Sequence, residues 1–298
     1  MSDAIKKNCN MYINMDKHLP INAITINSQN YLVLVVCDRN FERHIVVLNE
    51  KGNIIKTLLD TDDDSIKLAR DNTHLYIASS THNHSKLYKY DLDELCLVET
   101  RSFPFADMGS VSVNNDSIYL FDAKEGHIHE LNKDLKTNRK LDVNEYKDKR
   151  HGHSFNYIAA TNEGFTSIGL PGSEEEFYKL KAFLSYKFGE NIGKSNDYIK
   201  SVAYDKKNNV GYISFQNFII VMNDKGIDGI LDFKKKSIVS LTYDDIDTDS
   251  LVICFGGNKP LTGNVKVINK EMIDKLKLPI NNKKSEKIKG FLNKKPIK

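Results

Sequence analysis

Histidine pairs are the residues of this sequence whose type and spacing could do chemistry. Six of the nine histidines fall into three pairs with one residue between the partners, and these are His82 with His84, His127 with His129, and His151 with His153. On a strand, two residues so spaced project from one face about 7 Å apart and can share a metal ion if a third ligand converges. A divalent metal held by the first and third pairs is therefore one interpretation. Because a single pair is a weak motif, we favour surface or hydrogen-bonded histidines, no cofactor, and a structural role for the pair at 127 and 129.

Acidic clusters suggest a second kind of cation site. Asp245, Asp247 and Asp249 alternate as they do in calcium-binding loops. However, Ser250 replaces the expected turn glycine, and Gly256 occupies the position of the bidentate glutamate. We therefore predict solvated turns for this cluster. The aspartates between residues 60 and 64 lack the spacing altogether and would give their surface a negative patch.

Motifs of the common enzyme classes are absent. The sequence contains no Gly-x-Ser-x-Gly nucleophile elbow, no phosphate loop ending in Gly-Lys-Ser or Gly-Lys-Thr, no dinucleotide fingerprint and no His-Glu-x-x-His. The four cysteines lie far apart and form no Cys-x-x-Cys pair. That usage suits buried thiols in a reducing compartment. The sequence offers no recognisable reaction centre.

The elements that must position these residues come from a repeat. A short pattern, small–apolar–small–apolar and then a polar turn, returns six times, starting at Ala23, Ser65, Ser110, Tyr157, Ser201 and Ser240. The starts are 42, 45, 47, 44 and 39 residues apart. This period is typical of four-stranded propeller blades and not of helical repeats.

Each copy continues with strand-like segments. A run rich in β-branched and aromatic residues follows the polar turn, as in residues 31–36 and 210–215, and a third apolar run follows that one. In five of the six copies the third run ends on an Asn or Asp turn, because these residues tolerate the backbone of hairpins. The copy that starts at Tyr157 departs from the pattern, since it has a large residue at a small position and lacks this turn.

Over residues 20–280 the chain resembles the broad class of six-bladed β-propeller repeat proteins. The resemblance implies an all-β fold of six four-stranded antiparallel blades, in which closure leaves only short edges and small residues crowd around the axis. A seventh blade is disfavoured. For closure we favour an N-terminal strand at residues 12–15 within the segment 1–19, with residues 270–276 helical. The alternative takes the last outer strand from residues 274–278.

Up-and-down connectivity decides which loops share a face. Loops after the second strand of each blade and the crossovers between blades lie at one end of a propeller, which we call the loop-rich face. Because loops on a rigid scaffold commonly carry function, we take the ligand-binding candidates from this face. They are Arg43, Asp62, Asp64, His82, His84, Glu125, His151 and His153. If the protein is an enzyme, His151 or His153 is the expected general base.

Charge is unevenly distributed along the chain. Residues 281–298 contain seven lysines and one glutamate, a net +6, so that the formal net charge of +3 leaves about −3 for the rest. We expect this segment to be a disordered basic tail, and nucleic acid is disfavoured as a partner except through it. The N-terminus lacks the apolar segment of a secretory signal, and no stretch approaches 18 apolar residues. We therefore expect a soluble cytoplasmic protein without a membrane span.

These observations predict a non-catalytic recognition scaffold that binds a protein segment or small ligand on the loop-rich face near the axis. The alternative is a metal-dependent hydrolase or lyase of the lactonase or streptogramin-lyase type. In that mechanism an axial cation acts as a Lewis acid on a carbonyl or polarises water, and a histidine serves as general base.

Overall fold

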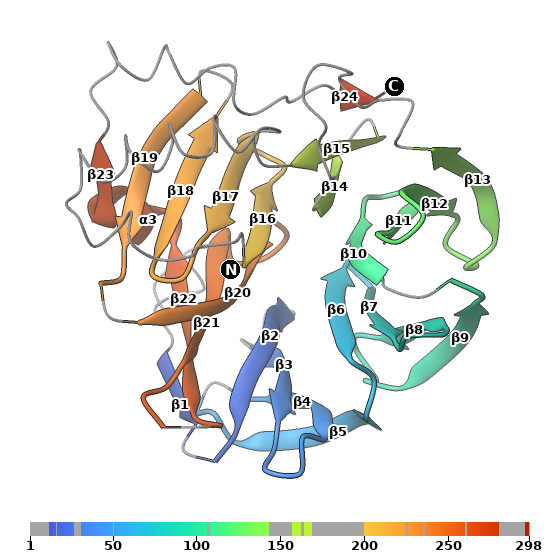
Figure 1. Cartoon of the computed structure of the whole chain (residues 1–298), viewed down its shortest axis with the longest axis horizontal. Coiled ribbons are helices and arrows are strands. Elements are labelled where there is room, and N and C mark those ends of the chain that lie inside the picture. Colours follow the sequence, from blue (N-terminus) through green and yellow to red (C-terminus); the bar gives the residue numbers. More distant parts are fainter. Residues whose placement is uncertain are drawn as a thin grey trace.

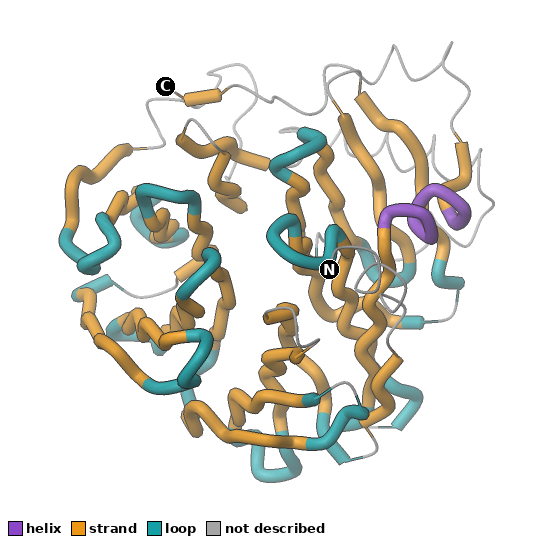
Figure 2. The backbone as a smooth tube through the Cα atoms, turned by 180° about the vertical axis from the view of Figure 1, so that it is seen from behind, coloured by secondary structure: helices purple, strands orange, loops and turns teal. Residues whose placement is uncertain are grey.

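A computed structural model describes most of the chain. The described residues are 12–15, 17–26, 31–49, 51–105, 108–142, 157–161, 164–168, 200–223, 226–234, 236–259, 261–279 and 296–297. Strands account for nearly all the regular structure among them, and the backbone tube in Figure 2 shows the described helix, α3, at the periphery. No helix in these ranges has the length and apolar content needed to cross a membrane.

Three consecutive sheets follow the expected order of four antiparallel strands, and we name each blade by its first, innermost strand. The β2 blade contains β2 (Leu19–Ile26), β3 (Tyr31–Cys37), β4 (Arg43–Leu48) and β5 (Ile54–Thr61). The β6 blade contains β6 (Ser65–Arg70), β7 (His74–Ser80), β8 (Ser85–Asp91) and β9 (Leu97–Phe103). The β10 blade contains β10 (Met108–Val113), β11 (Ile118–Asp122), β12 (His127–Leu131) and β13 (Thr137–Asp142).

The two last blades use both ends of the chain. The β16 blade contains β16 (Ser201–Asp205), β17 (Val210–Ser214), β18 (Phe218–Asn223) and β19 (Gly226–Asp232), and β23 (Lys277–Pro279) adds a fifth strand. The β20 blade contains β20 (Ser237–Asp244), β21 (Ser250–Gly256) and β22 (Gly263–Asn269), with β1 (Tyr12–Met15) as its outer strand. Helix α3 (Lys270–Leu276) links the two. This is the closure by an N-terminal strand that the sequence favoured.

The inner strands form a closed ring. Contacts run from β2 to β6, β10, β14, β16 and β20 and back to β2, and Figure 1 shows these strands around the axis. In the described residues five blades are complete, so the prediction of six four-stranded blades is wrong. The sixth position holds a three-stranded sheet of β14 (Tyr157–Thr161), β15 (Gly164–Ile168) and β24 (Pro296–Ile297). It falls at the copy that departs from the repeat, and the C-terminal β24 takes the place beside β15.

Asn and Asp side chains make the repeated turns. The residue that ends or follows the first strand of a blade accepts hydrogen bonds from backbone N–H groups two to four residues ahead, and these residues are Asp71, Asn114, Asp205 and Asp244. Asn49, Asp91 and Asn132 do the same after the third strand. Asn269 holds the equivalent place and caps α3. Each turn thus satisfies backbone donors with one short side chain.

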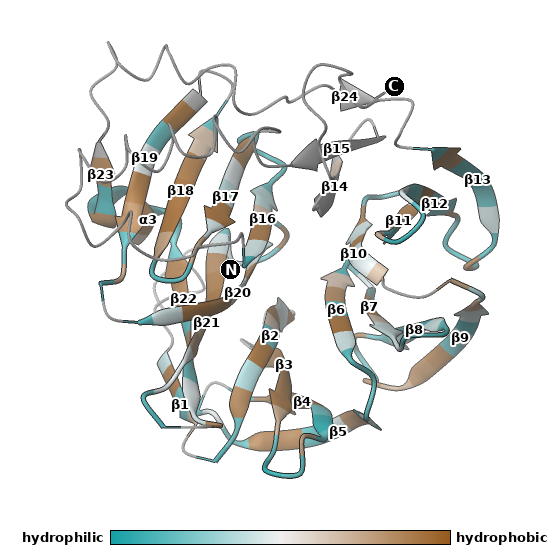
Figure 3. Ribbon diagram, in the orientation of Figure 1, coloured by the Kyte–Doolittle hydropathy of each residue, from teal (hydrophilic) through white to brown (hydrophobic). Residues whose placement is uncertain are grey.

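The core lies between neighbouring blades. Buried apolar side chains of one sheet pack on those of the next, as Ile24 and Val33 of the β2 blade do with Leu68 and Ile77 of the β6 blade. Figure 3 shows the hydrophobic colour concentrated on the strands. Since burial of apolar surface is the main driving force of folding, each blade is stable only between neighbours.

Ring closure leaves no room at Gly263. A Cβ there would overlap the carbonyl oxygen of Phe255 and the ring of Pro20, which belongs to the β2 blade. Gly263→Ala is expected to lower the free energy of unfolding by about 3 kcal/mol through overpacking. Gly211→Ala is the matched control, because a Cβ at Gly211 meets no atom within 4 Å. Urea unfolding followed by circular dichroism measures both, and equal effects would contradict this account of closure.

Candidate functional site

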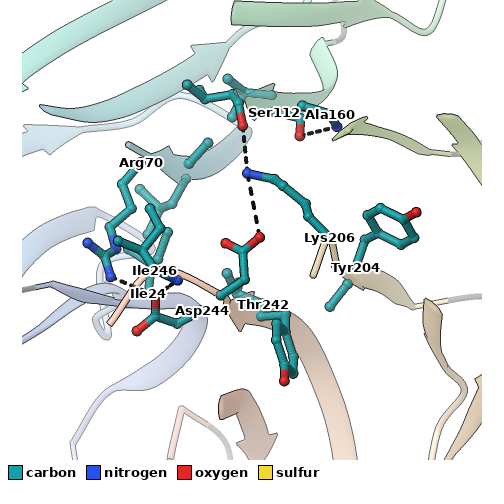
Figure 4. A pocket seen from close by; sticks show the side chains of 16 residues that line it. Ile24, Arg70, Ser112, Ala160, Tyr204, Lys206, Thr242, Asp244 and Ile246 are labelled. Atoms are coloured by element: carbon teal, nitrogen blue, oxygen red, sulfur yellow. Dashed lines mark hydrogen bonds and ion pairs between the residues drawn. The ribbon is translucent and has the colours of Figure 1, made fainter. Parts of the chain in front are cut away.

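Two cavities lie along the axis of the ring. The loop-side cavity, about 200 Å³, is lined by the first halves of the inner strands, where the crossovers enter from the loop-rich face. The turn-side cavity, about 60 Å³, is lined by their second halves (Figure 4). Leu68, Val111 and Thr242 line both. The axis therefore offers a larger site at the loop-rich face and a smaller one at the opposite end.

Cationic and hydroxyl side chains line the loop-side cavity. Lys67 is half-buried on β6, and Lys200 is exposed just before β16. Ser110, Ser201 and Ser240 add hydroxyl groups. The Ser201 hydroxyl donates to the carbonyl of Leu241 at 3.3 Å, and the buried Ser240 side chain faces the thiol of Cys254 on the neighbouring strand. These groups can bind an acceptor-rich ligand.

A buried ion pair closes one side of the turn-side cavity. The Nη2 atom of Arg70 lies 2.6 Å from Asp244 and 2.8 Å from Asp247. The hydroxyl of Thr25 donates to Asp244 at 2.6 Å, and that of Thr248 does so at the same distance. Burial opposes ionisation of Asp244, but Arg70 and the two hydroxyls hold its pKa below the ordinary value. One carboxylate therefore joins the β2, β6 and β20 blades.

Lys206 reaches into the same cavity from the β16 blade (Figure 4). Its ammonium donates to the carbonyl of Val113 at 2.8 Å and lies 3.8 Å from Asp245. Burial lowers the pKa of Lys206 and raises that of Asp245. Solvated turns were expected for Asp245, Asp247 and Asp249, and that prediction is wrong for Asp245, whereas Asp247 is exposed in the turn and Asp249 is half-buried. Asp245 is buried, Asp247 pairs with Arg70, and Asp249 accepts from Tyr243 at 2.9 Å.

The binding candidates taken from the sequence lie around the loop-rich face. Arg43 donates to the carbonyl of Asp62 at 3.3 Å, and Asp64 lies 3.3 Å from His82. The structure therefore brings four of them into two pairs. His84 belongs to the exposed turn that Thr81 caps, and Glu125 is exposed in the turn that begins at Asp122. None of these six lines either axial cavity. His151 and His153 lie outside the described residues.

One group in the described residues has ligand atoms spaced closely enough for a metal. Asp38, Glu42 and His44 offer donors within 4.8 Å of one another at the turn between β3 and β4. However, Asp38 accepts hydrogen bonds from the backbone of Asn40 and Glu42, and Nδ1 of His44 lies 2.8 Å from Asp60. One oxygen of Asp38 and one nitrogen of His44 are thus engaged, and the possible ligand atoms are the other Asp38 oxygen, Nε2 of His44 and the Glu42 carboxylate. His129 stacks on Phe105 at 4.6 Å between ring centroids, as its structural role predicts.

Comparisons with known proteins identify the architecture. No family model matches the sequence, and no curated protein matches it. The chain resembles the β-propeller domain of Cps50 (Swd1) from Myceliophteria thermophila with a TM-score of 0.52 at 8% identity, over 86% of this chain and 99% of that one. It also resembles a chain of the mitotic checkpoint complex with a TM-score of 0.50 at 15% identity, over 87% of this chain and 77% of that one. Fold and cavities define a β-propeller of four-stranded antiparallel blades.

Sequence reasoning missed the axial residues. Lys67 holds the third place of a small–apolar copy, where the other copies have small residues. A lysine at this place, where the other copies have small residues, was the signal that could have identified Lys67 as an axial residue. Arg70, Lys206 and Asp245 each come at the end of a first strand, and charge at that repeated position was a second signal.

Breaking the axial ion pair should destabilise the ring. Arg70→Met leaves the Asp244 carboxylate buried without its cation, and we expect a loss of about 3–5 kcal/mol in the free energy of unfolding. Arg70→Met/Asp244→Asn keeps the turn-capping oxygen and removes the charge, so part of the loss is recovered. Because the pKa of Asp244 is lowered by folding, the pair stabilises above about pH 4 and the effect is lost as pH falls through the folded value. If urea titrations show the double variant to be no more stable than Arg70→Met, this coupling between Arg70 and Asp244 is contradicted.

His44 should titrate above the ordinary histidine pKa. The bond to Asp60 raises its pKa, burial opposes this, and Asp38 adds a further increase. NMR titration should give a midpoint above about 6.5, and Asp60→Asn should lower it. The raised pKa stabilises the fold below that reference value and the effect is lost as pH rises through the folded value. Asp62→Asn is the control and should leave the midpoint unchanged. A wild-type midpoint at or below the reference would refute the assignment.

Proposed function

We propose that this propeller is a non-catalytic recognition scaffold that binds a protein segment at the axial end of its loop-rich face. The observation that carries the proposal is the loop-side cavity of about 200 Å³ on that face. Its lining is built on five inner strands of a rigid ring, β2, β6, β10, β16 and β20, and a preorganised polar recess lowers the cost of ordering a site on binding.

The loops around the cavity also favour a binding site at the loop-rich face. The pairs of Arg43 with Asp62 and of Asp64 with His82 lie at the junction of the β2 and β6 blades. They provide charged and aromatic groups beyond the cavity rim, where a longer segment would rest. Polar rims around a central contact are usual at protein interfaces. The two solved structures that the chain resembles support the architecture of a propeller.

Filling the loop-side cavity should weaken binding of the partner. Ser201→Tyr places a large side chain at the half-buried edge of the loop-side cavity, and Thr100→Tyr makes the same change on the exposed outer strand β9. A partner captured from the producing cells by wild type, then purified, should bind wild type and Thr100→Tyr equally. It should bind Ser201→Tyr at least about tenfold more weakly, the loss of a few contacts at an interface centre.

Two outcomes would overturn the scaffold. One is equal binding by Ser201→Tyr and Thr100→Tyr when circular dichroism shows both to be folded. The other is a stoichiometric divalent metal in protein purified without chelator, together with turnover of a lactone that is lost on metal removal. That second outcome would favour the metal-dependent hydrolase.

A further inference from the structure

Three side chains around the loop between β3 and β4 bring one nitrogen and two oxygen donors together. Asp38 directly follows β3, Glu42 is the last residue of the loop, and His44 is the second residue of β4. One donor atom from each of them lies within 4.8 Å of the other two. Histidine and carboxylate side chains together are a ligand set for a divalent metal ion.

The loop fixes the Asp38 carboxylate before any ion binds. Its Oδ1 atom accepts hydrogen bonds from the backbone N–H groups of Asn40 at 2.9 Å and of Glu42 at 3.0 Å. The backbone N–H of Asp38 donates to the carbonyl of Glu42 at 3.0 Å and closes the loop. The other oxygen, Oδ2, lies 3.5 Å from Nε2 of His44. Two of the three donor atoms are therefore held side by side by the backbone.

The distance between these two atoms suits zinc. Ligand atoms of a tetrahedral Zn²⁺ site, each bonded at about 2.0–2.2 Å, lie roughly 3.3–3.6 Å from one another. The Glu42 side chain is exposed and its carboxylate has no partner among the described residues, so a change of rotamer can bring it up as the third ligand. A site with an imidazole ligand favours Zn²⁺ and similar first-row ions over Ca²⁺ and Mg²⁺, which prefer oxygen ligands.

Asp60 of β5 lies outside this group and orients its histidine. Asp60 is paired with His44 across the two strands, and its Oδ1 lies 2.8 Å from Nδ1 of His44. Histidines that bind metals nearly always donate their other ring N–H to such an acceptor. A neutral imidazole has one N–H, so with that proton on Nδ1 the Nε2 lone pair faces the Asp38 carboxylate. Once the ring is neutral, a bound cation removes the repulsion between these two acceptors.

We infer that Asp38, Glu42 and His44 bind a divalent transition-metal ion of the zinc type, with Asp60 as the positioning residue for His44. The ligand atoms are Oδ2 of Asp38, the Glu42 carboxylate and Nε2 of His44. Three protein ligands leave a fourth position, which a water molecule takes in zinc sites of this kind. The inference is independent of the proposed function, because none of the four residues lines either axial cavity.

A Zn²⁺ titration of the full chain, freed of metals with a chelator, tests the site. NMR of the histidine ring nitrogens should show a shift at Nε2 of His44 that saturates at one ion per chain, while Nδ1 keeps its proton. His82 is the internal control, because it is exposed and lies 3.3 Å from Asp64 but has no third ligand close by among the described residues. Ca²⁺ should cause no comparable shift at His44.

Substitutions at exposed positions separate ligation from general charge. Glu42→Gln should weaken Zn²⁺ binding at least about tenfold, the loss of one ligand, whereas Asp62→Asn removes the same charge from a nearby exposed position and should have no effect. Asp38→Asn keeps the oxygen that caps the loop and should also weaken binding. Asp60→Ala should weaken it about 10–100-fold, and Asp60→Asn should recover part of that loss, because its amide oxygen still accepts from Nδ1.

Three results would overturn the site. They are an unchanged Nε2 resonance of His44 at saturating Zn²⁺, a shift of His82 as large as that of His44, which would show an adventitious ion only, and equal affinities of Glu42→Gln and Asp62→Asn. Binding of Ca²⁺ as tight as that of Zn²⁺ would overturn the assignment to a transition metal. None of these results bears on the scaffold, which Ser201→Tyr tests. If Zn²⁺ binds at His44 and no lactone is turned over, the metal site and the scaffold both stand.

Discussion

The Asp244 carboxylate is the constraint on which the closed ring depends. It lies at the end of the last inner strand and accepts hydrogen bonds from Thr25 of the β2 blade and Arg70 of the β6 blade. A propeller gains its stability only when every blade has two neighbours, because each sheet buries its faces against the next. One buried anion thus ties the beginning of the ring to its end. Removing water from this charge is costly, and the bound cation and hydroxyls offset that cost.

The strands and turns follow from local sequence. Alternating small and apolar residues gave the inner strands, and Asn or Asp at fixed places gave the turns, since one side-chain oxygen satisfies backbone donors a few residues away. The prediction failed where the sequence lost that chemistry. The sequence of the copy that starts at Tyr157 lacks the Asn or Asp turn after its third apolar run. At this position the structure has a three-stranded sheet completed by residues 296–297. A strand contributed from so far along the chain leaves no mark near its partner.

The axial residues could not be assigned in the same way. Arg70 and Asp244 are 174 positions apart, and nothing in the sequence around either one indicates the other. The acidic run from Asp245 to Asp249 resembled a solvated turn because its spacing was judged without its neighbours. Burial of Asp245 follows from the way strand ends converge on an axis, which only the ring as a whole determines. The loop candidates, in contrast, were chosen from connectivity alone, and their role in binding stays a prediction.

The pairing of β1 with β22 has a consequence for biosynthesis. Tyr12 pairs with Lys266 and Met15 with Gly263, so β1 leaves the ribosome before β22 and finds its partner only after the residues between them have been translated. At about 5–20 residues per second, this interval is on the order of tens of seconds. Throughout that time the nascent chain presents an unsatisfied N-terminal strand and an unsealed ring. Molecular chaperones that hold exposed strands would act on this intermediate, and ribosome stalling before β22 is translated would release chains that cannot close.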